Sequence, residues 1–520
     1  MRLGLLFQTV RHLRLRQLVY QIWYRFYKPK FQLLGRGSLA QLPSLMPFPF
    51  KMDSCRGEQF TFISLRGDFT HWQDISKGML WAYNLNYMDW LLQENLSYDE
   101  GKRWINHFIE NLSDNKIGQD PYPTALRIIN WIKFICLHRE EIPDEVRRSW
   151  EVSLWSQVKL LSKRLEFHLL ANHLLEDLCA LFIASIYFSD ETLAKSVSEL
   201  LRNELHEQLL ADGAHYEQSP MYHCILLDRL LDCYNLASCN MERLGDKEIL
   251  DSLRDAVVSM LGHLESIVYQ DCSIPLVNDS AYDIAPSYQD IVGYATRLGL
   301  RWSPIPLADC GYRYLRLHGW EALIDVGNIS ATYQPGHTHA DSLSYELRVN
   351  GEPLIIDTGI STYDKTSRRE YERSTKAHNT VMIGPHSSSQ TWGGFRVGRR
   401  ATTSVLLDTE SKILAQHDGY GQSNLHQREF ILDDNGFRVR DDIQHNQATS
   451  LLHLAPTVKI LSASLTEVKT SSGFVIDIIG AQQVVVKEDH ISRRYNQMEP
   501  ISVLEIVFSE QVEYVIRTNR

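Results

Sequence analysis

Residues that could bind a metal ion concentrate between positions 336 and 380. His339, Asp357 and His378 combine two imidazoles with one carboxylate, a ligand set that suits Zn²⁺, with Mn²⁺ and Ca²⁺ left open. His337 is a spare imidazole two residues before His339. The alternative is that these histidines are unrelated and form separate hydrogen bonds. The segment therefore predicts a divalent metal site, with zinc as the favoured ion.

The turn at Asn350 and Gly351 leaves the geometry of this metal site open. A strict two-residue turn would place Asp357 on the strand face opposite His339. The ligands converge if the turn has three residues, or if His337 and His339 lie in a loop before the strand.

A second polar group, Glu166, His168, Asn172 and His173, lies among leucines in LEFHLLANHLLED. If this segment is helical, positions 166 and 173 share a rough helical face, as do positions 168 and 172. An adjacent Asn–His pair is unusual there, because Asn is a poor helix former. Taken alone, the group fits a hydrogen-bonded core pair better than a substrate site.

A third group lies in DGAHYEQSPMYH, which contains Asp212, Glu217 and Tyr222. Asp-Gly and Ser-Pro predict a turn that enters a helix, with Pro220 in the first turn. Tyr222 near that helix start, beside cations, is expected to have a lowered phenol pKa that suits proton transfer. A packed tyrosine is the alternative. The paired carboxylates Asp212 and Glu217 could instead serve a glycoside hydrolase, although both also fit an ordinary turn.

Two further segments offer groups that could bind a sugar. NLNYMDWL contains Asn84, and PYPTALRIINW contains Arg127 and Trp131. An amide, a guanidinium and an aromatic platform suit hydroxyl, carboxylate and ring contacts, respectively.

The elements that must position these groups change in type along the chain. Residues 1–50 end in the proline-rich PSLMPFPF and predict an arm. Residues 51–305 repeat apolar side chains at three- and four-residue steps, which predicts an antiparallel helical toroid or solenoid. Residues 306–520 alternate apolar and polar positions between Asn-Gly turns, which predicts an antiparallel β-sandwich. The fold class is therefore α+β and multidomain.

Composition and charge limit the classes of partner and the locations that we expect for the protein. The chain has 520 residues and a net charge of −11, so nonspecific nucleic-acid binding driven by overall charge is not expected. No apolar run reaches the length of a membrane span. The start lacks the features of a secretory signal, so we expect a cytoplasmic location, with a periplasmic one still open. The first 32 residues are basic and amphipathic, which favours helix packing on the protein's own body over binding to a membrane surface.

Taken together and in order, the blocks NLNYMDWL, PYPTALRIINW, EFHLLANHLLED, DGAHYEQSPMYH and GHTHADSLSYEL resemble those of the heparinase II/III-like polysaccharide lyases. This family is related to glycosaminoglycan and alginate lyases. DTG and RREYERSTKAHNTV follow in the same order, so the resemblance covers most of the chain. It implies an (α/α) toroid followed by an antiparallel β-sandwich, which the patterning also predicts.

The resemblance implies roles for residues near the reaction. Asn172, with His173 beside it, is similar to the group that binds and neutralises the substrate's uronate carboxylate. Tyr222 is similar to the catalytic tyrosine, and His337 to a second proton-transfer residue.

The resemblance also extends to the metal and the substrate site. His339, Asp357 and His378 resemble the metal ligands, and Tyr371 and Arg373 lie where some relatives have further active-site groups. The chain departs from the family pattern at Asn86, where a histidine is expected, and at Asp177, where an asparagine is common. These departures bear on substrate choice more than on the reaction.

The implied activity is β-elimination in a uronic-acid-containing polysaccharide such as heparan, chondroitin or hyaluronan, which leaves unsaturated uronate ends. The alternatives are an alginate-type lyase, a glycoside hydrolase, and a non-catalytic or biosynthetic polysaccharide-binding protein in surface-polysaccharide assembly. The expected partner is an acidic polysaccharide, and the sequence leaves a homo-oligomer open.

Overall fold

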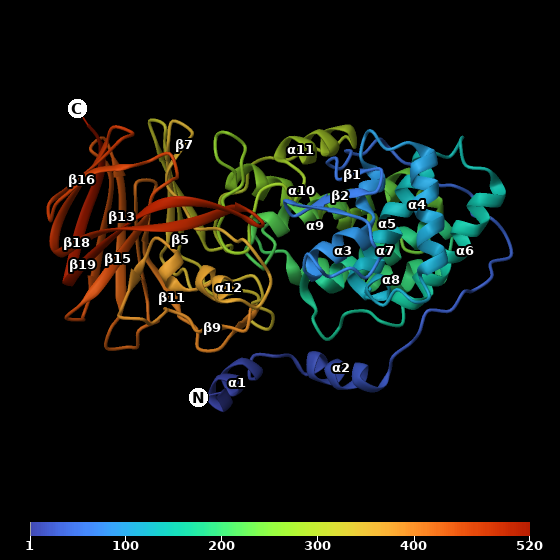
Figure 1. Ribbon diagram of the computed structural model, residues 1–520, viewed down its shortest axis with the longest axis horizontal. Helices are drawn as coiled ribbons and strands as arrows, with labels where there is room; N and C mark the ends of the chain where they lie inside the picture. Colours follow the sequence, from blue (N-terminus) through green and yellow to red (C-terminus); the bar gives the residue numbers. More distant parts are fainter. Residues whose placement is uncertain (1, 520) are drawn as a thin grey trace.

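The computed structural model describes residues 2–519 and shows an arm, a helical domain and a β domain in chain order (Figure 1). The helices are α1 (Arg2–Val10), α2 (Leu15–Phe26), α3 (Met79–Tyr87), α4 (Tyr98–Asn111), α5 (Pro121–Leu137), α6 (Asp144–Leu161), α7 (Ala171–Phe188), α8 (Glu191–Gln208), α9 (Pro220–Cys239), α10 (Glu248–Ile267), α11 (Tyr288–Arg297) and α12 (Ser367–Glu372). Most of them form the helical domain, so the predicted helical region is present.

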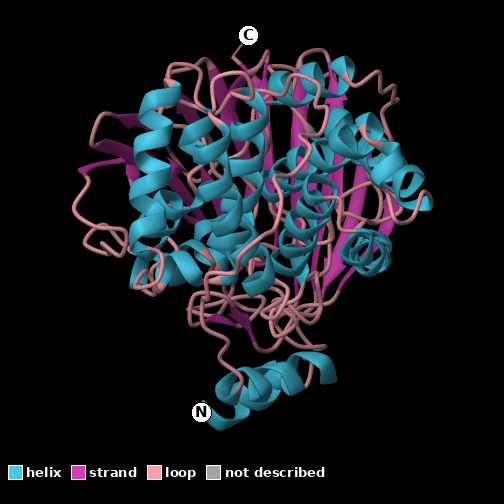
Figure 2. Ribbon diagram, turned by 90° about the vertical axis from the view of Figure 1, so that its right-hand side faces the viewer, coloured by secondary structure: helices cyan, strands magenta, loops and turns pink. Residues whose placement is uncertain are grey.

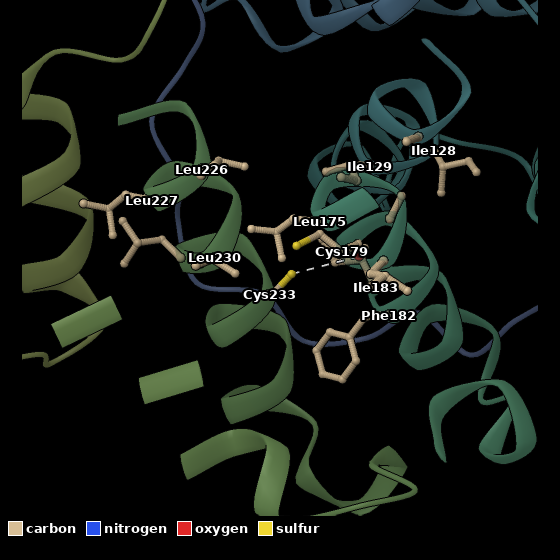
Figure 3. Packing of buried hydrophobic residues seen from close by; sticks show 14 of the residues in the cluster. Ile128, Ile129, Leu175, Cys179, Phe182, Ile183, Leu226, Leu227, Leu230 and Cys233 are labelled. Atoms are coloured by element: carbon tan, nitrogen blue, oxygen red, sulfur yellow. Dashed lines mark hydrogen bonds between the residues drawn. The ribbon is translucent and has the colours of Figure 1, made fainter. Parts of the chain in front are cut away.

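The core of the helical domain is built from α5, α7 and α9, which lie side by side (Figure 3). Leu175 and Cys179 of α7 face Leu230 and Cys233 of α9 in this core, and all four side chains are buried. Among the described helices, α7 alone is long and apolar enough to span a membrane, but 94% of it is buried inside the protein. Its apolar character is therefore explained by its central place in the fold.

The segment before α7 differs from the sequence prediction. Residues 162–170 are irregular, so Glu166 and His168 lie in a loop and not on a helix. Leu170, the residue before α7, has a left-handed φ of 64°, which a continuous helix could not contain. The continuous leucine pattern hid this break. Asn172 consequently lies in the first turn of α7, where its backbone N–H has no helical partner.

The strands form antiparallel sheets (Figure 2). They are β1 (Cys55–Arg56), β2 (Gln59–Phe62), β3 (Leu65–Asp68), β4 (Tyr312–Leu317), β5 (Trp320–Asp325), β6 (Tyr345–Val349), β7 (Glu352–Ile355), β8 (Val381–Met382), β9 (Thr391–Trp392), β10 (Arg396–Val397), β11 (Thr403–Asp408), β12 (Lys412–His417), β13 (His426–Asp433), β14 (Gly436–Ile443), β15 (Ala448–His453), β16 (Ile460–Ala463), β17 (Glu467–Thr470), β18 (Phe474–Arg494) and β19 (Gln497–Thr518). A four-stranded sheet, β4 to β7, shares one apolar core with a ten-stranded sheet that contains β11 to β19.

The turn between β6 and β7 settles the geometry that the sequence left open. Val349 pairs with Glu352, so Asn350 and Gly351 form a two-residue turn, and both have positive φ. The ladder has an irregularity between positions 347 and 348. His337 and His339 lie in the irregular segment before β6. The loop alternative is therefore the correct one.

The long hairpin of β18 and β19 reaches from the β domain to the helical domain (Figure 1). At its tip the Arg493 carbonyl accepts a hydrogen bond from the Tyr282 amide at 2.9 Å, and Asn496 donates to the Ile63 carbonyl at 2.9 Å. Tyr495 is buried there in a small apolar cluster with Met221 and Ile360. The hairpin therefore holds the two domains in one arrangement.

A buried ion pair fixes the β-domain loops near the predicted metal ligands. Arg428 of β13 donates to both carboxylate oxygens of Asp441 on β14, at 2.6 and 2.9 Å. Its Nη1 donates to the carbonyls of Leu343 and Asn379, at 2.9 and 2.6 Å, and its Nη2 also donates to Ser450 Oγ at 3.0 Å. Because both side chains are fully buried, loss of one partner would leave an uncompensated charge in the core.

We therefore expect Arg428→Ala to lower the free energy of unfolding by about 3–5 kcal/mol, measured by urea denaturation. Arg440→Ala is the matched control, because Arg440 lies on β14 in an exposed pair with Asp442. The control should change stability by less than about 1 kcal/mol. Equal effects of the two substitutions would contradict the importance of the buried pair.

Candidate functional site

A buried carboxylate, Asp279, joins the two domains at the centre of the candidate site. It accepts hydrogen bonds from His337 Nδ1 at 2.9 Å and from His339 Nε2 at 2.9 Å. Arg369 of α12 donates to both of its oxygens, at 2.5 and 2.7 Å. Burial raises the pKa of Asp279, but Arg369 and the two histidines outweigh this effect and hold the pKa well below its usual range. Asp279 is therefore an anion in the site.

The loop that carries His337 is held on its other side by Arg373. This guanidinium is almost fully buried and donates to the carbonyls of Thr338 and Pro335, at 2.7 and 3.2 Å. The Asp279 amide also donates to the His337 carbonyl at 3.1 Å. Both backbone and side-chain bonds thus fix the position of His337.

Two of the predicted catalytic residues, Asn172 and Tyr222, contact the ring of a third, His337. Asn172 Nδ2 lies 3.1 Å from His337 Nε2. The Tyr222 ring stacks on the His337 ring, with a distance of 3.9 Å between the centroids and an interplanar angle of 28°. The Tyr222 hydroxyl lies 3.1 Å from the Tyr363 hydroxyl. An amide, a phenol and an imidazole are therefore adjacent, although they come from positions far apart in the chain.

The tautomer of His337 follows from its partners. Nδ1 donates to Asp279, so the neutral ring has its lone pair on Nε2, the nitrogen that faces Asn172. Glu217 Oε2 lies 3.2 Å from the same Nε2. Burial raises the pKa of Glu217, and His337 acts against this rise. If His337 takes up a proton, two carboxylates stabilise the imidazolium.

Tyr222 lies in the first turn of α9, with Pro220 at the first position, as the sequence predicts. Its expected pKa shift is wrong in direction. Burial raises the pKa of Tyr222, and the hydrogen bond with Tyr363 only partly opposes this rise. The helix terminus and nearby cations do not overcome the loss of solvent around the phenol. Tyr222 is therefore protonated near neutral pH.

His173 faces a large cavity beside this group. Its Nδ1 lies 2.9 Å from Glu166 Oε2, and its ring lies 4.9 Å from the Tyr122 ring. Burial lowers the pKa of His173, but Glu166 outweighs this effect and the pKa is raised. The cavity has a volume of about 810 Å³. Its basic and aromatic lining includes Lys28, Lys30, Lys116, Arg164, Tyr83 and Tyr122, and these four cations outnumber the two carboxylates, Asp120 and Glu166. It therefore suits an anionic chain that stacks on aromatic rings.

A group of possible metal ligands lies behind His337. One ligand atom each from His339, Asp341 and His378 falls within 4.8 Å of the others, and all three residues are buried. His339 Nδ1 and His378 Nε2 are buried and have no hydrogen-bond partner. The remaining nitrogens are bonded to carboxylates, since His378 Nδ1 donates to Asp357 at 2.7 Å. Two free imidazole nitrogens oriented by carboxylates fit a divalent ion.

The carboxylates in this region favour a cation as well. Burial raises the pKa of Asp341, and burial together with Asp341 raises the pKa of Asp325 well above its usual range. Burial also tends to raise the pKa of Asp357, but His378 outweighs this effect, so the pKa of Asp357 is lowered. Asp357, a predicted ligand, therefore orients His378 in this structure, and Asp341 supplies the nearer free carboxylate.

The predicted substrate-binding residues are not brought together. Arg127 and Trp131 are fully buried in α5, and the Arg127 donors are occupied by the carbonyls of Gly118 and Asn86 and by Gln157. These two side chains support the helices and do not face a substrate. Their residue types suit sugar binding, but sequence alone does not separate a core position from a cleft.

Arg373, Tyr371 and Asn84 differ from one another in environment. Arg373 is committed to the backbone of the His337 loop, so its predicted contact with substrate is corrected to a positioning role. The Tyr371 hydroxyl donates to Asp489 of β18. Asn84 lines a separate cavity of about 480 Å³ with Tyr282.

Asp212 and Glu217 do not form a pair of hydrolytic carboxylates. Asp212 Oδ2 accepts hydrogen bonds from the Ala308 and Cys310 amides, at 2.9 and 2.8 Å. Glu217 instead accepts from the Asn172 amide at 3.0 Å. Asp212 lies within ligand distance of His263 and Cys310, but its carboxylate ties the segment of Ala308 and Cys310, just before β4, to the helical domain.

Sequence reasoning missed Asp279, Arg369 as its partner, and Tyr363. Asp279 lies in VNDSAYD, an irregular segment with no periodicity to mark it. The segment contains two aspartates, Asp279 and Asp283, and nothing in it distinguishes the buried one from the exposed one. Arg369 lies in the RREYERSTKAHNTV block, but nothing in that block indicated its partner.

Two family models match most of the chain. The model described as heparinase II/III N-terminus matches residues 127–295, and the one described as heparinase II/III-like, C-terminal, matches residues 301–516. A heparin-sulfate lyase of Pedobacter heparinus is 28% identical over 209 residues, 35% of this chain. A heparin-sulfate lyase of Bacteroides stercoris is 21% identical over 360 residues, 61% of this chain. The chain spans only 31% and 51% of the length of these relatives.

Solved structures show the same fold. A crystal structure of heparinase III has a TM-score of 0.67 and 15% identity, over 84% of this chain and 77% of that one. The heparan sulfate lyase HepC from Pedobacter heparinus has a TM-score of 0.58 and 16% identity, over 89% of this chain and 81% of that one. The predicted toroid and β-sandwich are therefore confirmed.

We expect the native protein to bind a divalent metal, and His339→Ala and His378→Ala to lose it, because each variant removes a free imidazole nitrogen. Elemental analysis of the purified proteins measures bound metal, and both variants should also unfold at a lower temperature. The exposed His318→Ala is the control and should keep its metal. A native protein that stays metal-free after incubation with zinc would refute the site.

Proposed function

We propose that this protein, which belongs to the heparinase II/III-like family, is a polysaccharide lyase that cleaves a uronic-acid-containing glycosaminoglycan by β-elimination. The observation that carries the proposal is the contact of Asn172, Tyr222 and His337 around one imidazole. This arrangement supplies a base, an acid and a polar group for a carboxylate within one site. The relatives are named heparin-sulfate lyases, which supports a sulfated substrate of the heparan type.

β-Elimination needs a base for the proton on C5 of the uronate. His337 Nε2 suits this task, because Asp279 holds Nδ1 as a donor and leaves the lone pair on Nε2. After proton transfer, Asp279 and Glu217 stabilise the imidazolium. The stabilising carboxylates are in place before the reaction, so little reorganisation is needed.

The leaving glycosidic oxygen needs a proton. Tyr222 suits this task, since its raised pKa keeps the phenol protonated and the hydroxyl is part-buried at the site. Its ring stacks on His337, so the acid and the base lie next to each other. We assign His337 as base and Tyr222 as acid.

The C5 proton becomes acidic only when the charge on the uronate carboxylate is offset. Asn172 lies next to the base, and its Oδ1 is buried without a partner, so its amide has capacity for a further contact. His173 adds positive charge from the adjacent position, because Glu166 raises its pKa. Together they stabilise the enolate-like dianion as it forms.

His339 and His378, with Asp341 or Asp357, would hold a divalent ion, which we propose to be zinc. When bound, the ion would supply positive charge that neutralises the surrounding carboxylates. His339 shares Asp279 with His337, so this site also fixes the position of the base. The basic side chains of the cavity beside His173 would bind the acidic chain.

We expect Tyr222→Phe to lower kcat by at least about 10²-fold, since it removes the proton donor but keeps the ring. The assay follows the ultraviolet absorbance of unsaturated uronate ends formed from heparan sulfate. Tyr288→Phe, which removes a phenol bonded to Glu265 elsewhere, is the control and should retain activity. Products that lack the double bond would instead show a hydrolase, and intact polymer with metal present would favour a binding protein.

We also expect Asp279→Asn to lower kcat by about 10²–10⁴-fold with little change in KM, because the amide no longer holds His337 in the required tautomer. Asp283→Asn, in an exposed pair with Arg494, is the matched control. Circular dichroism would verify that both variants are folded. Normal turnover in a folded Asp279→Asn variant would refute the role of this carboxylate.

A further inference from the structure

The N-terminal arm has a charge opposite to that of the chain as a whole. Residues 2–30 contain five arginines and two lysines and no acidic residue, whereas the complete chain has a net charge of −11. In the structure this segment forms α1 and α2, which lie along one side of the molecule (Figures 1 and 2).

One face of α2 packs on the body of the protein. Gln17 is buried and donates to the carbonyls of Leu169 and Tyr333, at 3.2 and 3.4 Å. The Tyr20 ring lies 4.7 Å from the Phe167 ring, and the Tyr24 hydroxyl donates to the Leu165 carbonyl at 2.6 Å. Packing on the protein therefore explains the inner face of the helix.

The outer face of α2 is apolar and exposed. It consists of Leu15, Val19, Ile22, Trp23 and Phe26, whose exposed fractions are 75%, 51%, 60%, 52% and 83%. Their spacing of four, three, one and three residues places them on one side of the helix. Leu6, Phe7 and Val10 of α1 are exposed as well. Packing on the protein explains none of these side chains, and a contiguous exposed apolar face marks a binding surface.

We propose that α1 and α2 bind the surface of an anionic phospholipid bilayer. The apolar outer face would enter the boundary between headgroups and acyl chains, and neighbouring cations such as Arg11 and Arg25 would contact the anionic headgroups. Charge supports this occupant over a second copy of the chain. A two-fold pairing of the arm would bring like charges together, because the arm has no acidic residue.

Co-sedimentation of the 520-residue chain with lipid vesicles tests the proposal. We expect binding to vesicles of phosphatidylcholine mixed with phosphatidylglycerol to be about tenfold tighter than to phosphatidylcholine alone, and to weaken as salt is raised. Equal affinity for both vesicles, or no binding to either, would overturn the proposal.

Two pairs of substitutions locate the contact. Trp23→Ser with Phe26→Ser should lower binding to the anionic vesicles by about tenfold or more, since it removes the two largest side chains of the outer face. Leu461→Ser with Ile479→Ser is the matched control, with exposed fractions of 68% and 69% in the β domain, and should bind as the native protein does. Activity on soluble polysaccharide should be unchanged in both.

Unchanged vesicle binding by the Trp23 and Phe26 variant would overturn the proposal. A second result would also overturn it. In that case the native protein would not bind vesicles but would self-associate in sedimentation velocity, and the same variant would abolish this self-association. That result would assign the outer face to a second copy of the chain.

Discussion

The candidate site and the packing of the two domains depend on one buried anion, Asp279. It lies between α10 and α11 of the helical domain, but its partners, His337, His339 and Arg369, belong to the β-domain part of the chain. A carboxylate without exposure to solvent is tolerated only when it is paired and hydrogen-bonded. Separation of the two domains would leave this charge uncompensated. Domain packing and the geometry of the site are therefore consequences of the same set of bonds.

The shared carboxylate also links the proposed base to the possible metal site. His337 and His339 each donate one ring nitrogen to Asp279, which fixes the tautomer of both. The free nitrogen of His337 faces Asn172, whereas the free nitrogen of His339 faces away toward His378. One anion thus orients two histidines in different directions, and under the proposed function a metal ion at His339 would position the base without contact with substrate.

Local patterns in the sequence predicted local structure well. The periodicities of α5 and α9 and the turn at Asn350 depend on neighbouring residues, and each is present in the structure. The break before α7 was missed because the leucine pattern runs through it. Asp279 could not be foreseen, since its partners lie 58 and 90 residues away and its own segment is irregular. The prediction that Arg127 binds substrate was wrong, because the residue type does not reveal that the side chain is buried.

The arm adds a physical connection between the outer surface and the site. Gln17 bonds to the carbonyl of Leu169, three residues before Asn172, and to that of Tyr333, four residues before His337. Tyr24 and Lys28 of the same arm line the basic cavity beside His173. Because these contacts use the inner face of α2, binding at the outer face would orient the cavity without displacing its walls. An arm bound in this way would hold the protein at a surface while Asn172 and His337 keep their geometry.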